Sequence, residues 1–508
     1  MSMLISIDPT QDNAVAINAA LNDPTRSIVV VGPGSGFTDT PIVVPSGKKL
    51  MGSGCGVTIL TRRNANQDGD YGPSLIRTQD GSTGIVISDL TLIAPKTETK
   101  VQGVWVRATT NFVVERVETF NMGYAFFAQE FAQYGVFRQL RSYNANVHFE
   151  TTQAYNILFD DILSGDGDGD NPLGFEAVWH CLLASRDITF RHARHRGSGS
   201  PFLIVANDIN GDPLGGLIDN ITFEDCQAVS TDGAIGMLIT NYNNLPVGNV
   251  VMVDCGVDYE NAAHGNLLGS VQVGNLRMRG GTWRSYSQEN FIVYAGATLE
   301  AVDVNVDVTT AAFGNVYNAY GNTRVIGGTL TLRTTTMVAG VFSTGTLYIS
   351  PTTKIVTPNV LYGPDAPFQV LEYVYKSDVT ANGSTLGAGT SSPQLVFNSQ
   401  QGAEYRVRLA GKVRKESSSG NIYLYLPSSV GALSASGYGA IRMQLANGTY
   451  QGDFISTGAI SANSGDIRMF DVDLTFIGTG NAFSLTFSGT TGGATMLAGA
   501  HLSIERLN

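Results

Sequence analysis

The sequence has little charge, few cysteines and no long apolar run. Charged residues make up 15% of the 508 residues, against about 25% in an ordinary globular protein. The four cysteines have no CxxC spacing and are too few for a disulfide framework. No apolar run reaches the length of a membrane span, and the first residues lack the basic and apolar regions of a secretory signal. We therefore expect a protein that is made in a cytoplasm and does not insert into a membrane, or that is secreted by a route the sequence does not show.

The composition that is present favours turn-rich β structure. The net charge of −12 lacks the basic footprint of a nucleic-acid-binding protein. Glycine accounts for 59 residues, about 12% of the chain, against a usual value of about 7%. Together with many Thr, Val and Asn residues, this composition is typical of strands joined by tight turns rather than of helix bundles.

A repeat extends through the first two thirds of the chain. Its copies are separated by 22 to 33 residues, and in most of them positions +1, +3 and +6 are apolar. Ile157, Phe159 and Ile162 follow Asn156 in this pattern. The copies begin at Gly84, Asn111, Tyr134, Asn156, Asp187, Asn220, Asn249 and Asn275, with fainter ones at Thr298 and Asn322.

The repeat predicts a parallel β-helix of about ten coils. Alternation at +1 and +3 indicates a strand, and this period with Asn, Asp and Gly corners indicates one coil per repeat. Each coil buries its apolar face on its neighbours. Asn156, Asp187 and Asn220 should therefore occupy equivalent corners. Cys226 and Cys255, both at +6, should stack in the interior as free thiols, with a disulfide or metal pair as the alternative.

The N-terminal segment predicts a cap for the open end of the solenoid. Asp12 can act as N-cap for a short Ala-rich helix that ends before Pro24. The AINAAL helix, the SIVVVGPG strand and the segment PIVVPSGKKLMGSGCGVTIL resemble the opening of the pectate-lyase-like superfamily of right-handed β-helices. That superfamily includes lyases, glycoside hydrolases, epimerases and phage tailspikes, so the resemblance leaves the reaction open.

The last third of the chain changes character. A proline-containing stretch precedes short alternating strands with Asn-Gly turns, which predict an antiparallel, jelly-roll-like sandwich. A β-helix followed by a small sandwich resembles the phage tailspike layout, which implies a homotrimer attached to a tail or baseplate protein in a virion. The predicted parts are a cap at 1–26, the β-helix at 27–350, a linker at 351–368 and the sandwich at 369–508, for trimerisation or carbohydrate binding.

The candidate site is placed beside the longest insertions. The three longest steps of the repeat are consecutive, and their extra residues form the loops 164–174, 207–216 and 241–246. Loops that leave a rigid scaffold commonly carry function. Strand alternation points Glu150 and Glu176 outward beside these loops, and Asp208 lies in one of them. Since glycoside hydrolysis needs an acid and a second carboxylate, these three are the catalytic candidates.

Other outward positions predict contacts to the glycan. Trp105 offers a stacking surface, and basic and acidic groups accompany the carboxylates. The substrate-binding candidates are Trp105, Arg107, Glu130, His148, His180 and Asp168.

A cluster of acidic residues allows a calcium site as an alternative to a solvated turn. Asp166, Asp168 and Asp170 alternate as in the start of a calcium loop. The EF-hand pattern then fails, because positions 6 and 12 are Asn171 and Ala177. No metal or other cofactor is otherwise expected.

The sequence thus predicts a tailspike-like protein that binds and depolymerises a bacterial capsule, exopolysaccharide or O-antigen by hydrolysis. One alternative is a polysaccharide lyase or epimerase that uses Arg107, Arg191 or His180 around a uronate. Another is an adhesin or fibre that holds a glycan without cutting it.

Overall fold

The structure is a computed structural model in which the chain forms two compact units, Met1–Arg284 and Ser285–Asn508. It describes residues 2–506 apart from 64–72, 97–99, 167–176, 207–216, 242–244, 261, 263–265, 288, 310–314, 333–336, 342–345, 351, 357–360, 365–369, 375–378, 382–394, 399–403, 417–419, 426–438, 445–449, 452–456, 463, 465, 478–481, 490–493 and 497–500. No helix among the described residues has the length and apolar character needed to cross a membrane.

The predicted capping helix, α1 (Asn13–Asn22), is present near the start of the first unit. Asp12 caps it, because its side chain accepts a hydrogen bond from the backbone N–H of Ala14 at 3.0 Å. Ile17 and Leu21 lie on the buried side of the helix. Strand β1 (Ser2–Ile5), which precedes the helix, pairs in parallel with β2 (Ile28–Val31), which follows it. The cap and its helix are confirmed.

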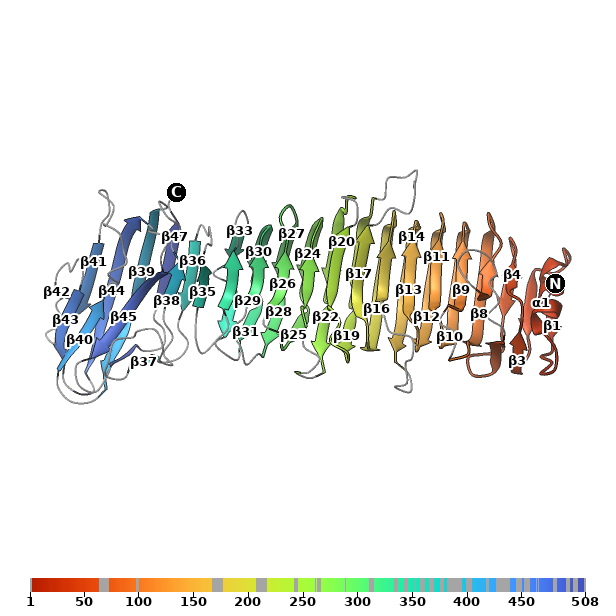
Figure 1. Ribbon diagram of the computed structural model, residues 1–508, viewed down its shortest axis with the longest axis horizontal. Coiled ribbons are helices and arrows are strands. Elements are labelled where there is room, and N and C mark those ends of the chain that lie inside the picture. Colours follow the sequence, from red (N-terminus) through yellow and green to blue (C-terminus); the bar gives the residue numbers. More distant parts are fainter. Residues whose placement is uncertain are drawn as a thin grey trace. The chain divides into compact units, whose positions relative to one another are not determined.

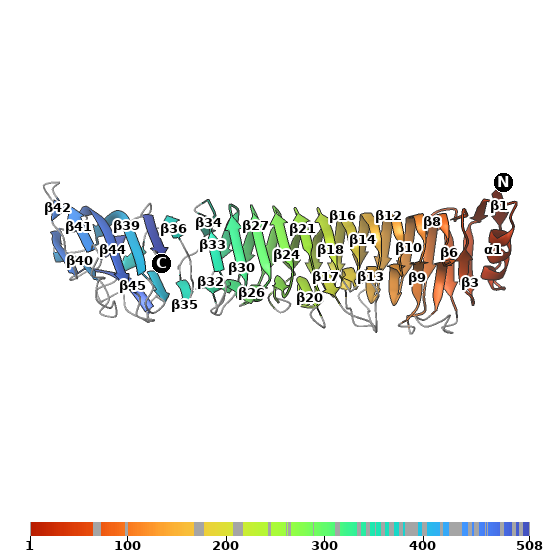
Figure 2. The same ribbon diagram turned by 90° about the horizontal axis from the view of Figure 1, so that it is seen from above.

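The rest of the first unit is a parallel β-helix (Figures 1 and 2). One strand of each turn belongs to sheet 1: β4 (Ile42–Val44), β7 (Ser74–Thr78), β9 (Gln102–Arg107), β11 (Tyr124–Gln129), β13 (Val147–Thr152), β15 (Ala177–Leu182), β17 (Ser200–Ala206), β20 (Met237–Asn241) and β23 (Gly269–Val271). The rest of each turn is a bent strand: β8 (Thr83–Ile93), β10 (Thr110–Phe120), β12 (Gln133–Tyr143), β14 (Tyr155–Gly165) and β16 (Arg186–Gly197). In the turn before β8 and in the later turns two shorter strands replace it, as in β5 (Lys49–Met51) and β6 (Thr58–Arg62), in β18 (Asp219–Glu224) and β19 (Gln227–Ser230), and in β21 (Asn249–Val253) and β22 (Gly256–Tyr259).

The corner prediction is confirmed by the register. Tyr155 and Ile157 pair with Arg186 and Ile188, which in turn pair with Asp219 and Ile221. Asn156, Asp187 and Asn220 therefore stack in one column. All three adopt the left-handed conformation, with φ of 53°, 55° and 55°, which Asn and Asp tolerate better than most residues.

A second left-handed residue at +5 bends each long strand. In β14 it is Asp161, with φ of 53°. We call the part of each bent strand before this residue sheet 2 and the part after it sheet 3. The bend consumes one residue of the alternation, so positions +6 and +8 both face the interior. His195, at +8, is accordingly buried.

The interior between the sheets is filled by columns of like side chains. The rings of Phe137, Phe159, Phe190 and Phe223 stack at centroid distances of 4.7, 4.6 and 5.2 Å. Trp179 is part of the core. Cys226 and Cys255 are buried free thiols in consecutive turns, and burial raises the pKa of Cys226 well above its usual value. The thiol ladder is confirmed.

The second unit contains parallel turns and antiparallel sheets. The parallel strands are β26 (Glu289–Val293), β27 (Thr298–Val302), β28 (Asn305–Val308), β29 (Asn315–Ala319), β30 (Asn322–Ile326), β31 (Thr329–Leu332), β32 (Met337–Val341), β33 (Thr346–Ile349), β34 (Lys354–Val356) and β35 (Leu361–Pro364). Strands β34 and β35 lie within residues 351–368, the segment that the sequence suggested as a linker. The predicted C-terminal antiparallel structure is present: β39 (Glu404–Lys415) pairs with β44 (Ile467–Ile477) and β47 (His501–Arg506), and β40 (Gly420–Tyr425) pairs with β43 (Thr457–Ala462) and β45 (Ala482–Gly489).

Candidate functional site

The outer face of sheet 1 brings several of the predicted site residues into one row. Trp105 pairs with Phe127, Phe127 with Glu150, and Glu150 with His180, on the successive strands β9, β11, β13 and β15. The stacking of the turns therefore aligns side chains that are 75 residues apart in sequence. We call these four residues the Trp105 row.

The predicted exposure of this row is wrong. Trp105 is 2% exposed and the Glu150 side chain 4%, and His180 is also buried. The indole N–H of Trp105 donates to Gln129 Oε1 at 2.9 Å, which satisfies the ring's polar atom on the next turn. Alternation fixes the face on which a side chain lies but not what covers it, and large side chains on turns about 4.8 Å apart cover one another.

Glu150 and His180 form a buried pair. The His180 Nδ1–H donates to Glu150 Oε2 at 2.8 Å, and the Thr152 hydroxyl donates to Glu150 Oε1 at 2.9 Å. The His180 Nε2 is buried and has no hydrogen-bond partner among the described residues. A carboxylate that holds one imidazole nitrogen fixes the tautomer and leaves the other nitrogen as an acceptor. The pair can orient a proton acceptor, but its burial separates it from a polymer in solution.

Arg107 and Glu130 lie at the end of this face and are partly exposed, as predicted. The Arg107 Nε–H donates to Glu130 Oε2 at 2.7 Å, and Asp80 lies 3.5 Å from the same guanidinium. The guanidinium carbon is 5.6 Å from the centroid of the Trp105 ring. These residues are therefore held in an ion-pair cluster.

His148 lies inside the β-helix, so its predicted outward orientation is wrong. Its Nδ1 is hydrogen-bonded to the Ser142 hydroxyl at 2.7 Å, and its ring centroid is 5.5 Å from that of His195. Burial lowers the pKa of His148 well below 6.5. His148 lies at the corner where β13 begins, and its contacts with Ser142 and His195 place its ring in the interior.

The remaining predicted residues lie mostly outside the described residues. Glu176, Asp208, Asp168 and Asp170 all do. The Asp166 carboxylate accepts hydrogen bonds from the backbone and hydroxyl of Ser198 and from the Thr231 hydroxyl, at 2.9 to 3.2 Å. Within the described part of the chain, no group of three or more His, Cys, Asp and Glu side chains is arranged to hold a metal ion. Calcium binding at this cluster stays a prediction.

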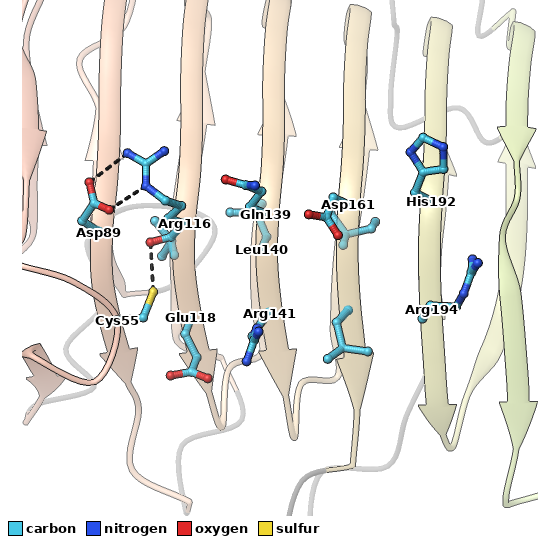
Figure 3. A pocket seen from close by; sticks show the side chains of 13 residues that line it. Cys55, Asp89, Arg116, Glu118, Gln139, Leu140, Arg141, Asp161, His192 and Arg194 are labelled. Atoms are coloured by element: carbon cyan, nitrogen blue, oxygen red, sulfur yellow. Dashed lines mark hydrogen bonds and ion pairs between the residues drawn. The ribbon is translucent and has the colours of Figure 1, made fainter.

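A groove that sequence reasoning missed lies at the corner between sheets 2 and 3 (Figure 3). It encloses about 630 Å³ and crosses the turns of β8, β10, β12, β14 and β16. Its walls come from the left-handed +5 residues and from the outward +7 residues beyond the bend. We call it the corner groove. It is lined by Cys55, Asp89, Arg116, Val117, Glu118, Gln139, Leu140, Arg141, Asp161, Ile162, Leu163, His192 and Arg194.

Some charged groups of the corner groove are neutralised within the protein. The Arg116 guanidinium donates to both oxygens of Asp89, at 2.7 and 3.0 Å (Figure 3). This contact lowers the pKa of Asp89 below its ordinary value. Arg194 is paired with Asp225 at 2.8 Å. The Cys55 thiol donates to the Arg116 carbonyl at 3.0 Å, and its pKa is raised by partial burial. These contacts fix one side of the groove.

Other polar groups of the corner groove have no strong partner. Gln139, Arg141 and Asp161 are exposed and make no side-chain hydrogen bond or ion pair within the described residues, while Glu118 accepts only a long 3.4 Å contact from Thr91. Leu163, which pairs with Arg141 of the preceding turn, adds an exposed apolar surface. Figure 3 shows Glu118, Gln139, Arg141 and Asp161 on neighbouring strands. The groove therefore presents carboxylate, amide, guanidinium and apolar groups to a ligand.

In the adjacent column of sheet 2, by contrast, the charged side chains are paired. Glu115 is paired with Arg138 on the next turn, and Asp160 with Arg191 at 2.8 Å. Each of these groups holds a partner of opposite charge. The contrast indicates that the unpaired polar groups of the corner groove are available for binding.

Comparison with known proteins identifies the fold. No family model and no curated protein sequence matches the chain. A tailspike protein of Escherichia coli bacteriophage HK620, solved as a mutant with a hexasaccharide, superimposes with a TM-score of 0.51 at 12% identity, over 93% of this chain and 91% of that one. The chain has the β-helix fold of phage tailspikes.

Two further solved structures are similar at lower scores. The catalytic unit of a GH87 α-1,3-glucanase from Streptomyces thermodiastaticus gives a TM-score of 0.45 at 14% identity, over 70% of this chain and 69% of that one. The tailspike and capsular polysaccharide depolymerase of Acinetobacter baumannii bacteriophage Fri1 gives 0.38 at 9% identity, over 98% and 86%. At these identities the likeness concerns the fold alone.

Proposed function

We propose that this protein binds a bacterial surface polysaccharide in the corner groove and cleaves it by hydrolysis. The observation that carries the proposal is the set of unpaired polar groups in the groove, on turns that otherwise pair their charges. The tailspike fold supports it, since the HK620 tailspike was solved with a bound hexasaccharide. A groove that extends over several turns is open to a chain of sugar units rather than to one small molecule.

Hydrolysis needs one carboxylic acid that protonates the leaving oxygen and one carboxylate that activates water or attacks carbon. In the groove, Glu118 and Asp161 have no cation within ion-pair distance among the described residues, so they are the candidates for these two roles. Asp89 is a poor acid because its contact with Arg116 favours the ionised form. Arg141 and Gln139, between the two candidate carboxylates in the register, can orient sugar hydroxyls.

The carboxylates chosen from the sequence form a competing set. Glu150 is buried, and both of its oxygens accept hydrogen bonds within the protein, from His180 and Thr152. It would have to lose these contacts to reach a glycosidic oxygen. Glu176 and Asp208 remain candidates on the sequence argument alone. We therefore place catalysis in the groove and use the sheet 1 carboxylates as the rival assignment.

The test is digestion of a panel of purified capsular polysaccharides, exopolysaccharides and O-antigens, with reducing ends measured over time. We expect Glu118→Gln and Asp161→Asn each to lower turnover about 100-fold or more. Glu115→Gln is the matched control, because Glu115 is on the same strand as Glu118 but is paired with Arg138 outside the groove. Unchanged turnover in both groove variants, with loss in Glu150→Gln, would move catalysis to sheet 1.

The products distinguish hydrolysis from the two alternatives. Hydrolysis adds about 18 Da of water at each cut, whereas elimination leaves an unsaturated sugar that absorbs near about 235 nm. Binding without any cleavage would indicate an adhesin or fibre. The groups suggested for elimination are all engaged: Arg107 with Glu130, Arg191 with Asp160 and His180 with Glu150. This favours hydrolysis.

The tailspike fold also supports a homotrimer that is attached to a phage tail or baseplate protein in the virion. Sedimentation should then give a mass about three times that of one 54.0 kDa chain. A mass of one chain at micromolar concentration would contradict the trimer.

A further inference from the structure

The corner between sheets 1 and 2 carries two exposed aromatic side chains on one turn. Phe131 is 44% exposed and Tyr134 57%. In the described part of the first unit, the other exposed large hydrophobic side chains are aliphatic: Met3, Leu4, Val15, Val57 and Leu163. Among the described residues of this unit, these two, three positions apart, are the aromatic side chains that are exposed. We call them the aromatic corner.

Both residues adopt a backbone conformation that is unfavourable for bulky side chains. The φ angle is 70° at Phe131 and 56° at Tyr134. On the turns before and after, the position of Tyr134 is occupied by Asn111 and Asn156, with φ of 54° and 53°. Asn tolerates this left-handed conformation, whereas a large ring there is an outlier. The fold alone would favour Asn at this position as well.

The same corner is one residue longer than its neighbours. Residues 130–132 connect β11 to β12, whereas 108–109 and 153–154 make the equivalent connections on the adjacent turns. The extra residue projects Phe131, whose ring is stacked with that of Tyr155 at 6.4 Å and an interplanar angle of 12°. Strained backbone conformations cluster at functional sites, and Phe131 and Tyr134 combine such a conformation with exposed apolar surface.

Polar groups on either side indicate which ligand. Asn111 and Asn156 are exposed on the turns that flank Tyr134, and the Asn156 amide makes no hydrogen bond within the described residues. No ring contact joins Tyr134 to another aromatic side chain there. The C–H face of a pyranose packs on an aromatic ring, while its hydroxyls hydrogen-bond to amides at the rim. Aromatic rings bordered by amides therefore fit a sugar unit.

We infer that the aromatic corner is a second carbohydrate-binding site, separate from the corner groove, which takes a pyranose unit of the glycan on Tyr134 and Phe131. This inference rests on the proposed function, since it assumes a polysaccharide ligand. Two sites on different corners of the same turns would hold one chain at two points or two neighbouring chains. Either arrangement raises the avidity of the protein for a dense polysaccharide layer.

The test measures binding of full-length protein to an array of purified capsular and O-antigen polysaccharides. The key variant is Tyr134→Asn, which restores the residue found on both adjacent turns and should leave the thermal midpoint unchanged or higher. We expect about tenfold weaker binding of the polysaccharide recognised by the wild type, and a similar effect of Phe131→Ala. Tyr348→Asn is the matched control, since Tyr348 is an exposed tyrosine of the second unit.

A proton NMR spectrum of an oligosaccharide cut from that polysaccharide gives a second readout. Ring C–H protons stacked on Tyr134 should shift upfield in the complex, and Tyr134→Asn should remove the shift. Unchanged affinity and unchanged shifts in the corner variants, with loss of binding in Arg141→Gln of the groove, would overturn the inference and leave the proposed function intact. A change in sedimentation mass in Tyr134→Asn without a change in glycan affinity would overturn it in favour of contact between copies of the chain.

Discussion

Acidification should destabilise the first unit through its interior histidines. His195 is fully buried, and burial lowers its pKa from 6.5 to about 4 despite the nearby Asp166 and Asp232. Its Nε2–H donates to the Ser198 carbonyl at 3.1 Å, so Nδ1 accepts from the Ser164 hydroxyl at 3.0 Å. Both nitrogens of the neutral ring are therefore hydrogen-bonded. Protonation would place a charge in the core and remove the acceptor that the Ser164 hydroxyl uses.

The sign and size of the effect follow from the two pKa values. A histidine whose folded pKa is depressed is protonated more readily in the unfolded chain, so acid favours unfolding. Stability from this group is fully present above about pH 6.5 and is lost as the pH falls toward about 4. The difference corresponds to about 3 kcal/mol. His148 acts in the same direction, since burial also lowers its pKa.

The assay is urea unfolding followed by near-ultraviolet circular dichroism at several values between pH 8 and pH 4. The unfolding free energy of the wild type should decrease across this range, and the decrease should be smaller in His195→Gln. His192→Gln is the matched control, because His192 lies three residues away on the same strand but is exposed and bound to Asp160. Identical pH profiles for the wild type and His195→Gln would refute the reasoning.

Three further substitutions test how core packing, backbone conformation and surface ion pairs contribute to the free energy of unfolding. Phe159→Ala removes a ring from the middle of the stacked column and should lower the unfolding free energy by about 3–5 kcal/mol in the urea assay; a loss under about 1 kcal/mol would mean that the column relaxes around the cavity. Gly281→Ala should cost at least about 2 kcal/mol, because its φ is 82° and a Cβ would lie 1.9 Å from the Cys255 carbonyl oxygen; a wild-type thermal midpoint would contradict that geometry. Asp160→Asn breaks a partly exposed pair with Arg191 and should cost at most about 1 kcal/mol; a larger loss would show that the fold depends on the charge column.

The architecture of the first unit could be predicted because the fold repeats a local rule. One turn has Ile157, Phe159 and Ile162 at +1, +3 and +6. Because most turns repeat this apolar pattern, the inward-facing positions can be identified from many copies. The left-handed corner at Asn156 is also recognisable in the sequence, because Asn and Asp tolerate this conformation better than most residues. A pattern repeated with a nearly constant period gives a register between turns as well as a strand.

The exposure of the site residues could not be predicted in the same way. Whether Trp105 is accessible depends on Phe127 and Gln129 of the next turn and on the Arg107 guanidinium near its ring. His148 was assigned outward from alternation, but it lies next to a corner, where alternation is interrupted. The two errors have different causes: the pattern within a strand contains no information about what packs against its outer face, which misled the placement of Trp105, whereas the corner beside His148 interrupts the pattern itself.

The corner groove was missed because its signal lies in the differences between repeats. At +4, the column Glu115, Arg138, Asp160 and Arg191 alternates in charge, so each group meets an opposite charge on a neighbouring turn. At +7, the column Glu118, Arg141, Leu163 and Arg194 does not alternate throughout, and the structure leaves Glu118 and Arg141 without an ion pair. A charged column with unpaired members therefore contributes less to the stability of the β-helix. Its unpaired side chains are available to bind a ligand. Because the paired and unpaired columns are separate, substitutions in the groove should alter glycan binding while the turns beneath it keep their fold.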